Sequence, residues 1–182
     1  MIYPIVIYGN PVLKKAAAPI EKDYPELKQL TSDMFETMYR ADGCGLAAPQ
    51  IGLGIRVFVV DVSMMADEDP SLAGFKKVFV NPEILSYEGE EVAREEGCLS
   101  LPGISETVRR PNTIRIHYFD EDWKEHDDVI SGFAARAVQH EYDHLEGHVF
   151  VDKISLIRRQ MISSKLSAMS RGKYNCRYKT KN

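Results

Sequence analysis

The segment QHEYDHLEG, residues 139–147, constrains the fold of this chain more than any other stretch. It contains His140, Glu141 and His144 in the pattern His-Glu-x-x-His. Residues four apart in an α-helix lie about 6 Å apart along its axis on one face, so both imidazoles can bind one metal ion. Burying three such polar groups on a mostly apolar helix is costly unless they bind something. We therefore expect a buried helix beside a metal, with further ligands supplied from elsewhere.

Two metallopeptidase patterns supply the third ligand downstream of such a helix, and neither fits. One uses a distant Glu, but no Glu follows Glu146. The other extends the motif to HExxHxxGxxH, but Phe150 occupies the last position and His148 comes two residues early. Asp152 and Cys176 remain as downstream candidates, so the third ligand is open on this side of the motif.

A better candidate lies upstream in EEGCLSLPG, residues 95–103. Cys98 follows Gly97, and a thiolate is a good third ligand beside two imidazoles, for zinc or for ferrous iron. Taken alone, Cys98 is equally consistent with a small buried core residue. The unfilled ligand position favours the metal-binding interpretation.

A third segment, GCGLAAPQIG at residues 43–52, has two glycines around Cys44 and ends near Gln50. Glycines let a backbone approach a ligand closely, and Gln50 offers an uncharged donor. The alternative is a helix stop and a turn before the next strand.

The hydrophobic pattern predicts an α+β fold, with antiparallel sheets packed around the metal-binding helix and with N-terminal and C-terminal helices. Helical spacing predicts helices over residues 25–41, 132–146 and 155–170. Strands are expected at 55–61, 78–82, 84–92 and 113–120, the second ending at its proline and the last forming a hairpin with the segment after Trp123. The stretch 63–76 reads as a polar loop.

The charge distribution separates the end of the chain from the rest. Nine Lys or Arg and no Asp or Glu occur in residues 153–182, which leaves 14 basic against 27 acidic residues elsewhere. We assign residues 1–170 to one domain and 171–182 to a basic tail. A basic end on an acidic body predicts an anionic partner, and a solvated helix with a frayed terminus is the alternative.

Composition predicts a cytoplasmic protein. The start MIYPIVIYGN lacks the features of a signal peptide, and no apolar run is long enough for a membrane span. The three cysteines show no paired spacing, so a disulfide framework is not expected.

In order, GCGLAAPQ (43–50), EGCLS (96–100) and QHEYDH (139–144) resemble the three motifs of peptide deformylases and match them at every fixed position. The resemblance implies a metal-dependent hydrolase that removes the N-formyl group from formylmethionine at the start of newly made polypeptides, releasing formate. It implies one divalent ion, Fe²⁺ in the cell, with Zn²⁺, Ni²⁺ or Co²⁺ able to substitute; the ligand types alone do not separate these metals.

The resemblance also implies roles for the motif residues. It makes Cys98, His140 and His144 the metal ligands and Glu141 the proton carrier. Oxyanion stabilisation falls to the Gln50 amide and the Leu99 backbone N–H. Glu96 is expected to support the ligands by pairing with Arg110, or failing that with Arg109.

Substrate binding is predicted from the same resemblance. The peptide main chain adds a strand against Cys44, Gly45 and Gly97. Phe133 and Ala137 continue the metal face of the helix and are expected to wall the methionine pocket, with core packing as the alternative. Arg136 is expected to line the rim while its charge stays in solvent.

The expected partners are nascent formylmethionyl peptides and, through the basic helix and tail, the ribosome; no membrane or DNA contact is expected. Two other functions stay open. A metallopeptidase shares the helix motif but lacks its third ligand here. A structural metal module is usually closed by four protein ligands, and only three are evident.

Overall fold

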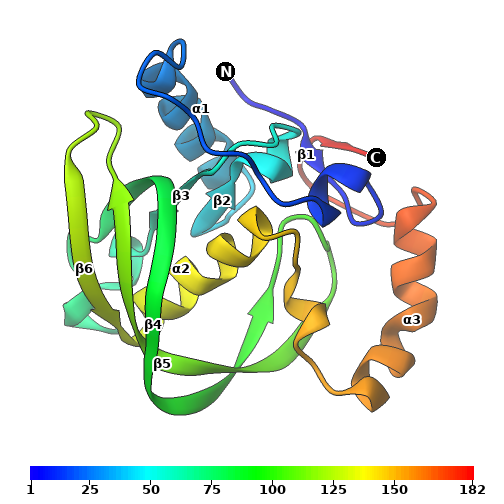
Figure 1. The fold of residues 1–182 in the computed structure, drawn as a ribbon. Helices are drawn as coiled ribbons and strands as arrows, with labels where there is room; N and C mark the ends of the chain where they lie inside the picture. The colour runs from blue at the N-terminus through cyan, green and yellow to red at the C-terminus, as the bar shows by residue number, and fades with distance from the viewer.

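The computed structural model describes residues 1–182 as an α+β fold built around one helix, as the sequence predicts. The three helices are α1 (Leu27–Arg40), α2 (Gly132–Leu145) and α3 (Leu156–Ser170). The strands are β1 (Ile5–Val6), β2 (Gly45–Ala47), β3 (Val57–Asp61), β4 (Lys76–Gly97), β5 (Ser105–Phe119), β6 (Glu125–Ser131) and β7 (Thr180–Lys181). Figure 1 shows α2 at the centre, with the strands around it and α3 at the side.

Five strands form an antiparallel sheet in the order β2-β3-β4-β5-β6, and β1 pairs in parallel with β7. One apolar cluster packs α2 against this sheet, including Phe58, Phe79 and Val138. A second holds α1 against β2 and β3 through residues such as Met34 and Met38. The helix α2 therefore packs against the buried face of the sheet, and this packing fixes the position of the histidine motif.

The predicted helices are confirmed within about two residues at each end. Gly147 ends α2 as expected, with φ of 78°. A Cβ at Gly147 would lie 2.7 Å from the Lys14 carbonyl oxygen, so this position needs a glycine for two reasons. No helix in the chain is long and apolar enough to cross a membrane.

The prediction that a strand ends at Pro82 is wrong, because β4 continues through it to Gly97. The pairing register shifts between Val80 and Glu83, and Asn81 adopts φ of 47° there. Such a bulge accommodates a proline that has no N–H for the ladder. The Asn81 N–H and the Pro82 carbonyl both bond to Arg56 instead, at 2.8 and 2.9 Å.

The β4–β5 pair is also longer than predicted, and this length positions the site. Pairing continues to Gly97 opposite Ser105, although residues 93–96 are mostly charged and exposed. The strand therefore delivers Cys98, at its end, to the histidine face of α2. Hydrophobic alternation did not predict this part of the strand because most of its residues are charged.

Candidate active site

The two histidines of α2 lie one turn apart, with ring centroids separated by 5.3 Å. Cys98 Sγ lies 3.4 Å from His144 Nε2. One ligand atom each from Cys98, His140 and His144 lies within 4.8 Å of the other two. Ligands at tetrahedral Zn–S and Zn–N distances are about 3.5 Å apart, so this donor set fits one divalent ion. Burial lowers the pKa of His144 and keeps its ring neutral, which is the form that binds metal.

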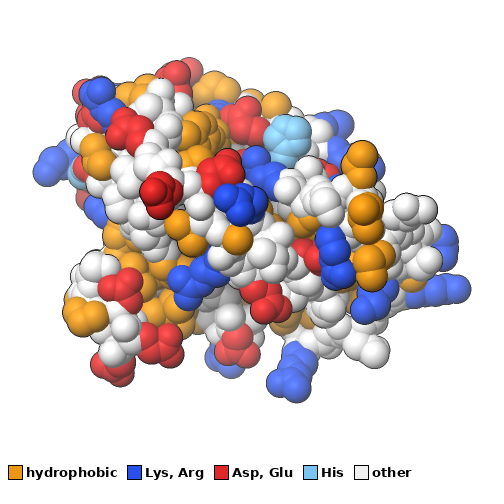
Figure 2. Space-filling view, turned by 90° about the horizontal axis from the view of Figure 1, so that it is seen from below, with side chains coloured by type: hydrophobic (Ala, Val, Ile, Leu, Met, Phe, Trp, Pro, Cys, Tyr) orange, Lys and Arg blue, Asp and Glu red, His pale blue; other side chains and the backbone are white.

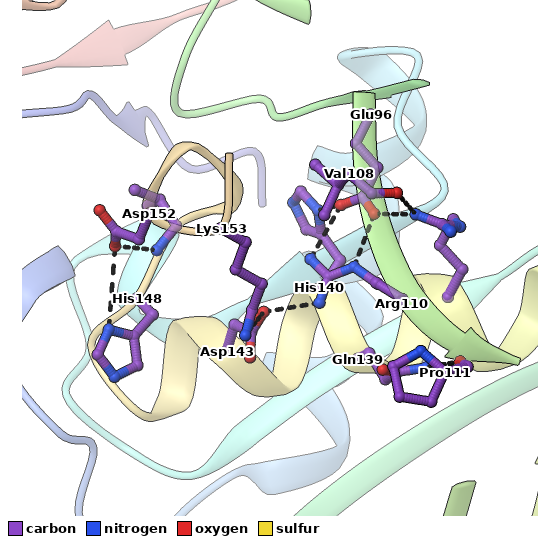
Figure 3. A network of polar contacts seen from close by, with 12 residues as sticks. Glu96, Val108, Arg110, Pro111, Gln139, His140, Asp143, His148, Asp152 and Lys153 are labelled. Atoms are coloured by element: carbon purple, nitrogen blue, oxygen red, sulfur yellow. Dashed lines mark hydrogen bonds and ion pairs between the residues drawn. The ribbon is translucent and has the colours of Figure 1, made fainter. Parts of the chain in front are cut away.

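Glu96 orients His140 from the far side of the ring. Its carboxylate lies 2.9 Å from His140 Nδ1, which leaves Nε2 for the ion. Arg110 donates to both carboxylate oxygens, at 2.6 and 2.9 Å. In Figure 3 the Glu96 carboxylate lies close to both His140 and Arg110. Burial opposes ionisation of Glu96, but the bonds to His140 and Arg110 outweigh it and lower the pKa to about 2.

Arg136 does not keep its charge in solvent, which corrects the sequence prediction. Its side chain is only 8% exposed and pairs with Glu96. It also donates to the Val108 carbonyl at 3.1 Å and to the Val92 carbonyl. The charge is buried because the extended β4–β5 pair passes over this part of α2. Arg109 instead pairs on the surface with Glu91, at 3.3 Å.

Asp143 is a site residue that the sequence reasoning missed. It accepts from Arg110 Nη1 at 2.8 Å, and Lys153 lies 3.7 Å away. The α2 helix thus supports Arg110 with a carboxylate one turn from His140. The available signal was the Asp within QHEYDH, which matched the family motif but carried no assigned role.

Glu141 is 5% exposed, and its Oε2 has no hydrogen-bond partner within the chain. Burial raises the pKa of this carboxyl group to about 7. A Cβ on Gly45 would lie 2.8 Å from Glu141 Cγ, so only glycine lets β2 approach this side chain. One oxygen of this carboxylate, which neighbours His140 in the chain, is therefore free of hydrogen bonds within the protein and can accept a proton.

Gln50 points its amide nitrogen into the site. Its Oε1 accepts from the Ala47 N–H at 2.9 Å, which determines how the amide is turned. Nε2 then lies 3.5 Å from Cys98 Sγ and 3.2 Å from Ser100 Oγ. Ser100, fully buried in the EGCLS motif, was another unassigned contact.

A cleft of about 640 Å³ opens onto these groups. The predicted substrate residues all line it: Cys44, Gly45, Gly97, Phe133 and Ala137. Residues 175–178 also line it, although the sequence placed them in a tail. Phe133 and Ala137 also pack against the hydrophobic core around α2. Each side chain therefore lies between the cleft and the core, the two positions that the sequence left open for it.

The free edge of β2 faces this cleft. The Asp61 N–H donates to the Cys44 carbonyl at 2.9 Å, so these two residues form a hydrogen-bonded pair between β2 and β3. In an antiparallel ladder the next residue points the opposite way, so the Gly45 N–H and C=O face away from β3. Because β2 is the sheet's outermost strand, these groups are available to an added strand.

A Cys-His-His donor set, a free buried carboxylate and an open cleft together define a metal-dependent hydrolase. Comparison with known proteins shows which family of hydrolases this is. The model of the family described as polypeptide deformylase matches residues 2–160. The chain belongs to this family, whose members remove N-formyl groups from nascent peptides, as the motif resemblance implied.

The similarity to individual deformylases covers nearly the whole chain. Peptide deformylase from Christiangramia forsetii is 50% identical over 186 residues, covering 98% of this chain and 95% of that protein. The Cytophaga hutchinsonii enzyme is 49% identical over 181 residues, covering 100% and 97%. The crystal structure of the Thermus thermophilus enzyme matches with a TM-score of 0.84 at 38% identity, covering 95% of this chain and 100% of that one.

Proposed function

We propose that Cys98, His140 and His144 hold the metal of this deformylase and that Glu141 carries the proton. The observation that carries the proposal is the convergence of three donor atoms, two of them on the helix that also holds the buried Glu141, whose Oε2 has no partner. A divalent metal held there supplies Lewis acidity, which lowers the pKa of water and polarises a carbonyl.

Glu141 Oε2 takes the proton of the attacking water and gives it to the departing amine. Burial raises the pKa of this carboxyl group above its ordinary value, which helps the carboxylate to accept a proton from water and then to donate it. Formate and a free amino terminus are the products.

Gln50 and Leu99 stabilise the oxygen that becomes negative during attack on the formyl carbon. The Gln50 amide nitrogen is already turned toward Cys98, and it donates to the reacting oxygen in exchange for one of its two contacts, to Cys98 Sγ or Ser100 Oγ. The Leu99 N–H has no acceptor within the chain. One such donor lowers the barrier by about 3 kcal/mol.

The substrate binds extended between the edge of β2 and the end of β4. Gly45 supplies the free main-chain groups described above. Gly97 lies where β4 pairs only with β5, so its other edge also faces the cleft. Main-chain recognition accepts many sequences after the first residue, while Phe133 and Ala137 form the wall that receives the methionine side chain.

Iron is proposed as the metal in the cell, with zinc, nickel or cobalt able to replace it, and the cytoplasm as the compartment. These follow from the family and from thiolate–imidazole chemistry, which suits several divalent ions.

The ribosome is proposed as a partner through α3. Figure 2 shows apolar side chains between basic ones over this helix, where Leu156, Ile157 and Met161 are exposed. Arg158 and Arg159 form ion pairs with Glu106 and Asp152, which offset part of the positive charge of the helix. The surface of α3 is therefore partly apolar as well as basic. Loss of ribosome co-sedimentation in Ile157→Ser, with Ser163→Ala unchanged, tests this contact; equal binding by both refutes it.

Formate release from formyl-Met-Ala tests the proposed function. Protein prepared without oxygen is loaded in turn with ferrous iron, nickel and zinc. We expect metal-dependent formate production and no cleavage of casein. Metal-loaded, folded protein that releases no formate contradicts the proposal and favours a structural metal site; casein cleavage favours a peptidase.

A further inference from the structure

The C-terminal segment, residues 174–181, lies against the active cleft rather than extending from the domain. Asn175, Cys176, Arg177 and Tyr178 line the cleft together with Cys98 and Glu141. The segment ends in β7, which pairs with β1, and the red chain end runs beside β1 in Figure 1. The sequence predicts a site that lies wholly within residues 1–170. In the structure, residues 175–178 of the predicted tail line the same cleft.

Backbone hydrogen bonds hold this segment in place. The Ile5 N–H donates to the Lys179 carbonyl and the Ile7 N–H to the Lys181 carbonyl, both at 2.9 Å. The Tyr174 hydroxyl bonds only to the end of the chain, to Thr180 Oγ1 at 2.9 Å and to Asn182 Oδ1 at 3.0 Å.

The turn at residues 98–101 receives hydrogen bonds from three parts of the chain. Its own Leu101 N–H donates to the Cys98 carbonyl at 2.9 Å. Tyr8, just after β1, donates its N–H to the Ser100 carbonyl at 2.9 Å. The Tyr178 hydroxyl donates to the Leu99 carbonyl at 2.6 Å.

These bonds occupy three successive carbonyls of the turn and restrain the peptide groups on both sides of Leu99. The Leu99 N–H is left without an acceptor in the chain, as an oxyanion donor requires. The Leu99 side chain packs tightly at Gly43, where a Cβ would lie 2.7 Å from Leu99 Cδ1. The Leu99 side chain is thus held by packing against Gly43, and the Leu99 carbonyl is held by the Tyr178 hydroxyl.

We infer that Tyr178 is a positioning residue of the active site: its hydroxyl fixes the Leu99–Ser100 peptide group and thereby holds Leu99 so that its N–H can stabilise the reacting oxygen. The C-terminal segment then lines the cleft and also positions a group that takes part in the reaction. This inference rests on the proposed function of Leu99. It assigns to the end of the chain a role in the chemical step, separate from any docking by α3.

Tyr178→Phe removes only the hydroxyl and is the test, and Tyr174→Phe is its matched control in the same segment. We expect Tyr178→Phe to lower kcat for formyl-Met-Ala about fivefold, the effect of one hydrogen bond, with KM changed less than about twofold. Metal content and melting temperature are expected to equal those of Tyr174→Phe. Amide hydrogen exchange over residues 98–101 is expected to rise in Tyr178→Phe alone.

Three results overturn the inference. The first is a Tyr178→Phe enzyme whose kcat and amide exchange match those of Tyr174→Phe. The second is a rise in KM without a fall in kcat, which reduces the segment to a binding wall. The third is a fall in kcat that parallels lost metal or lost folded protein. If the wild type releases no formate, the proposed function fails, and the exchange measurement still tests the Tyr178–Leu99 contact by itself.

Discussion

Replacing Glu96 by Gln is expected to weaken both metal binding and folding, because one carboxylate serves two buried arginines and His140. It accepts from Arg110 at 2.6 and 2.9 Å, pairs with Arg136, and contacts His140 Nδ1 at 2.9 Å. The arginine side chains are 3% and 8% exposed. Glutamine keeps the shape but leaves two buried cations with less negative charge.

The magnitude follows from this burial. Removing one partner of a buried ion pair costs about 3–5 kcal/mol, and Asp143, which remains beside Arg110 at 2.8 Å, places the expected loss near the lower end. Loss of the carboxylate that orients His140 is expected to weaken metal affinity about 10- to 100-fold. Denaturant unfolding measures the first effect, and competition with a chelator measures the second.

Glu91→Gln is the matched control, because Glu91 lies on the same strand but forms an exposed pair with Arg109. It is expected to change the free energy of unfolding by less than about 0.5 kcal/mol. A Glu96→Gln protein that keeps the wild-type metal affinity and unfolds at the same denaturant concentration as Glu91→Gln would contradict this role of Glu96.

Three further substitutions test the methionine pocket, the contact of β2 with Glu141 and the ion pair of α3 with Glu106. Ala137→Phe is expected to raise KM for formyl-Met-Ala at least about tenfold by filling the methionine pocket, and unchanged kinetics rule out that pocket wall. Gly45→Ala is expected to lower kcat/KM about 100-fold because the new Cβ displaces Glu141; steady-state assay of the folded variant detects this, and wild-type activity contradicts it. Hydrogen bonds from Arg158 lower the pKa of Glu106 below its usual 4.5, so their stabilisation is present above pH 4.5 and lost as the pH falls. Glu106→Gln is therefore expected to be about 1 kcal/mol less stable than wild type at pH 7, with a smaller difference at pH 3, by denaturant unfolding; a pH-independent difference contradicts this.

Hydrophobic periodicity and short motifs predicted the helices and the α+β class because those signals are local. The bulge at Pro82 and the charged end of β4 were missed because pairing with β5 overrides local preference there. Arg136 was misplaced for a related reason. A helical pattern shows which side chains share a face, but it does not show that distant strands cover the neighbouring face.

The position of the C-terminal segment could not be read from its composition. Lys179, Lys181 and their neighbours are polar and charged, which is typical of an unpacked tail. Their order comes from main-chain bonds to β1 and from the hydroxyl of Tyr178, which leave no periodic signal. The motifs suggested that Cys98 meets α2, but the contact of Asp143 with Arg110 is visible only in the structure.

The most direct test of the central claim measures metal content and formate release together in Glu141→Gln and Cys98→Ala. We expect Glu141→Gln to bind one ferrous or nickel ion per chain as tightly as wild type but to release formate at least about 100-fold more slowly. Cys98→Ala is expected to lose both the ion and the activity. Full turnover by Glu141→Gln, or unaltered metal binding by Cys98→Ala, contradicts the assignment of the site.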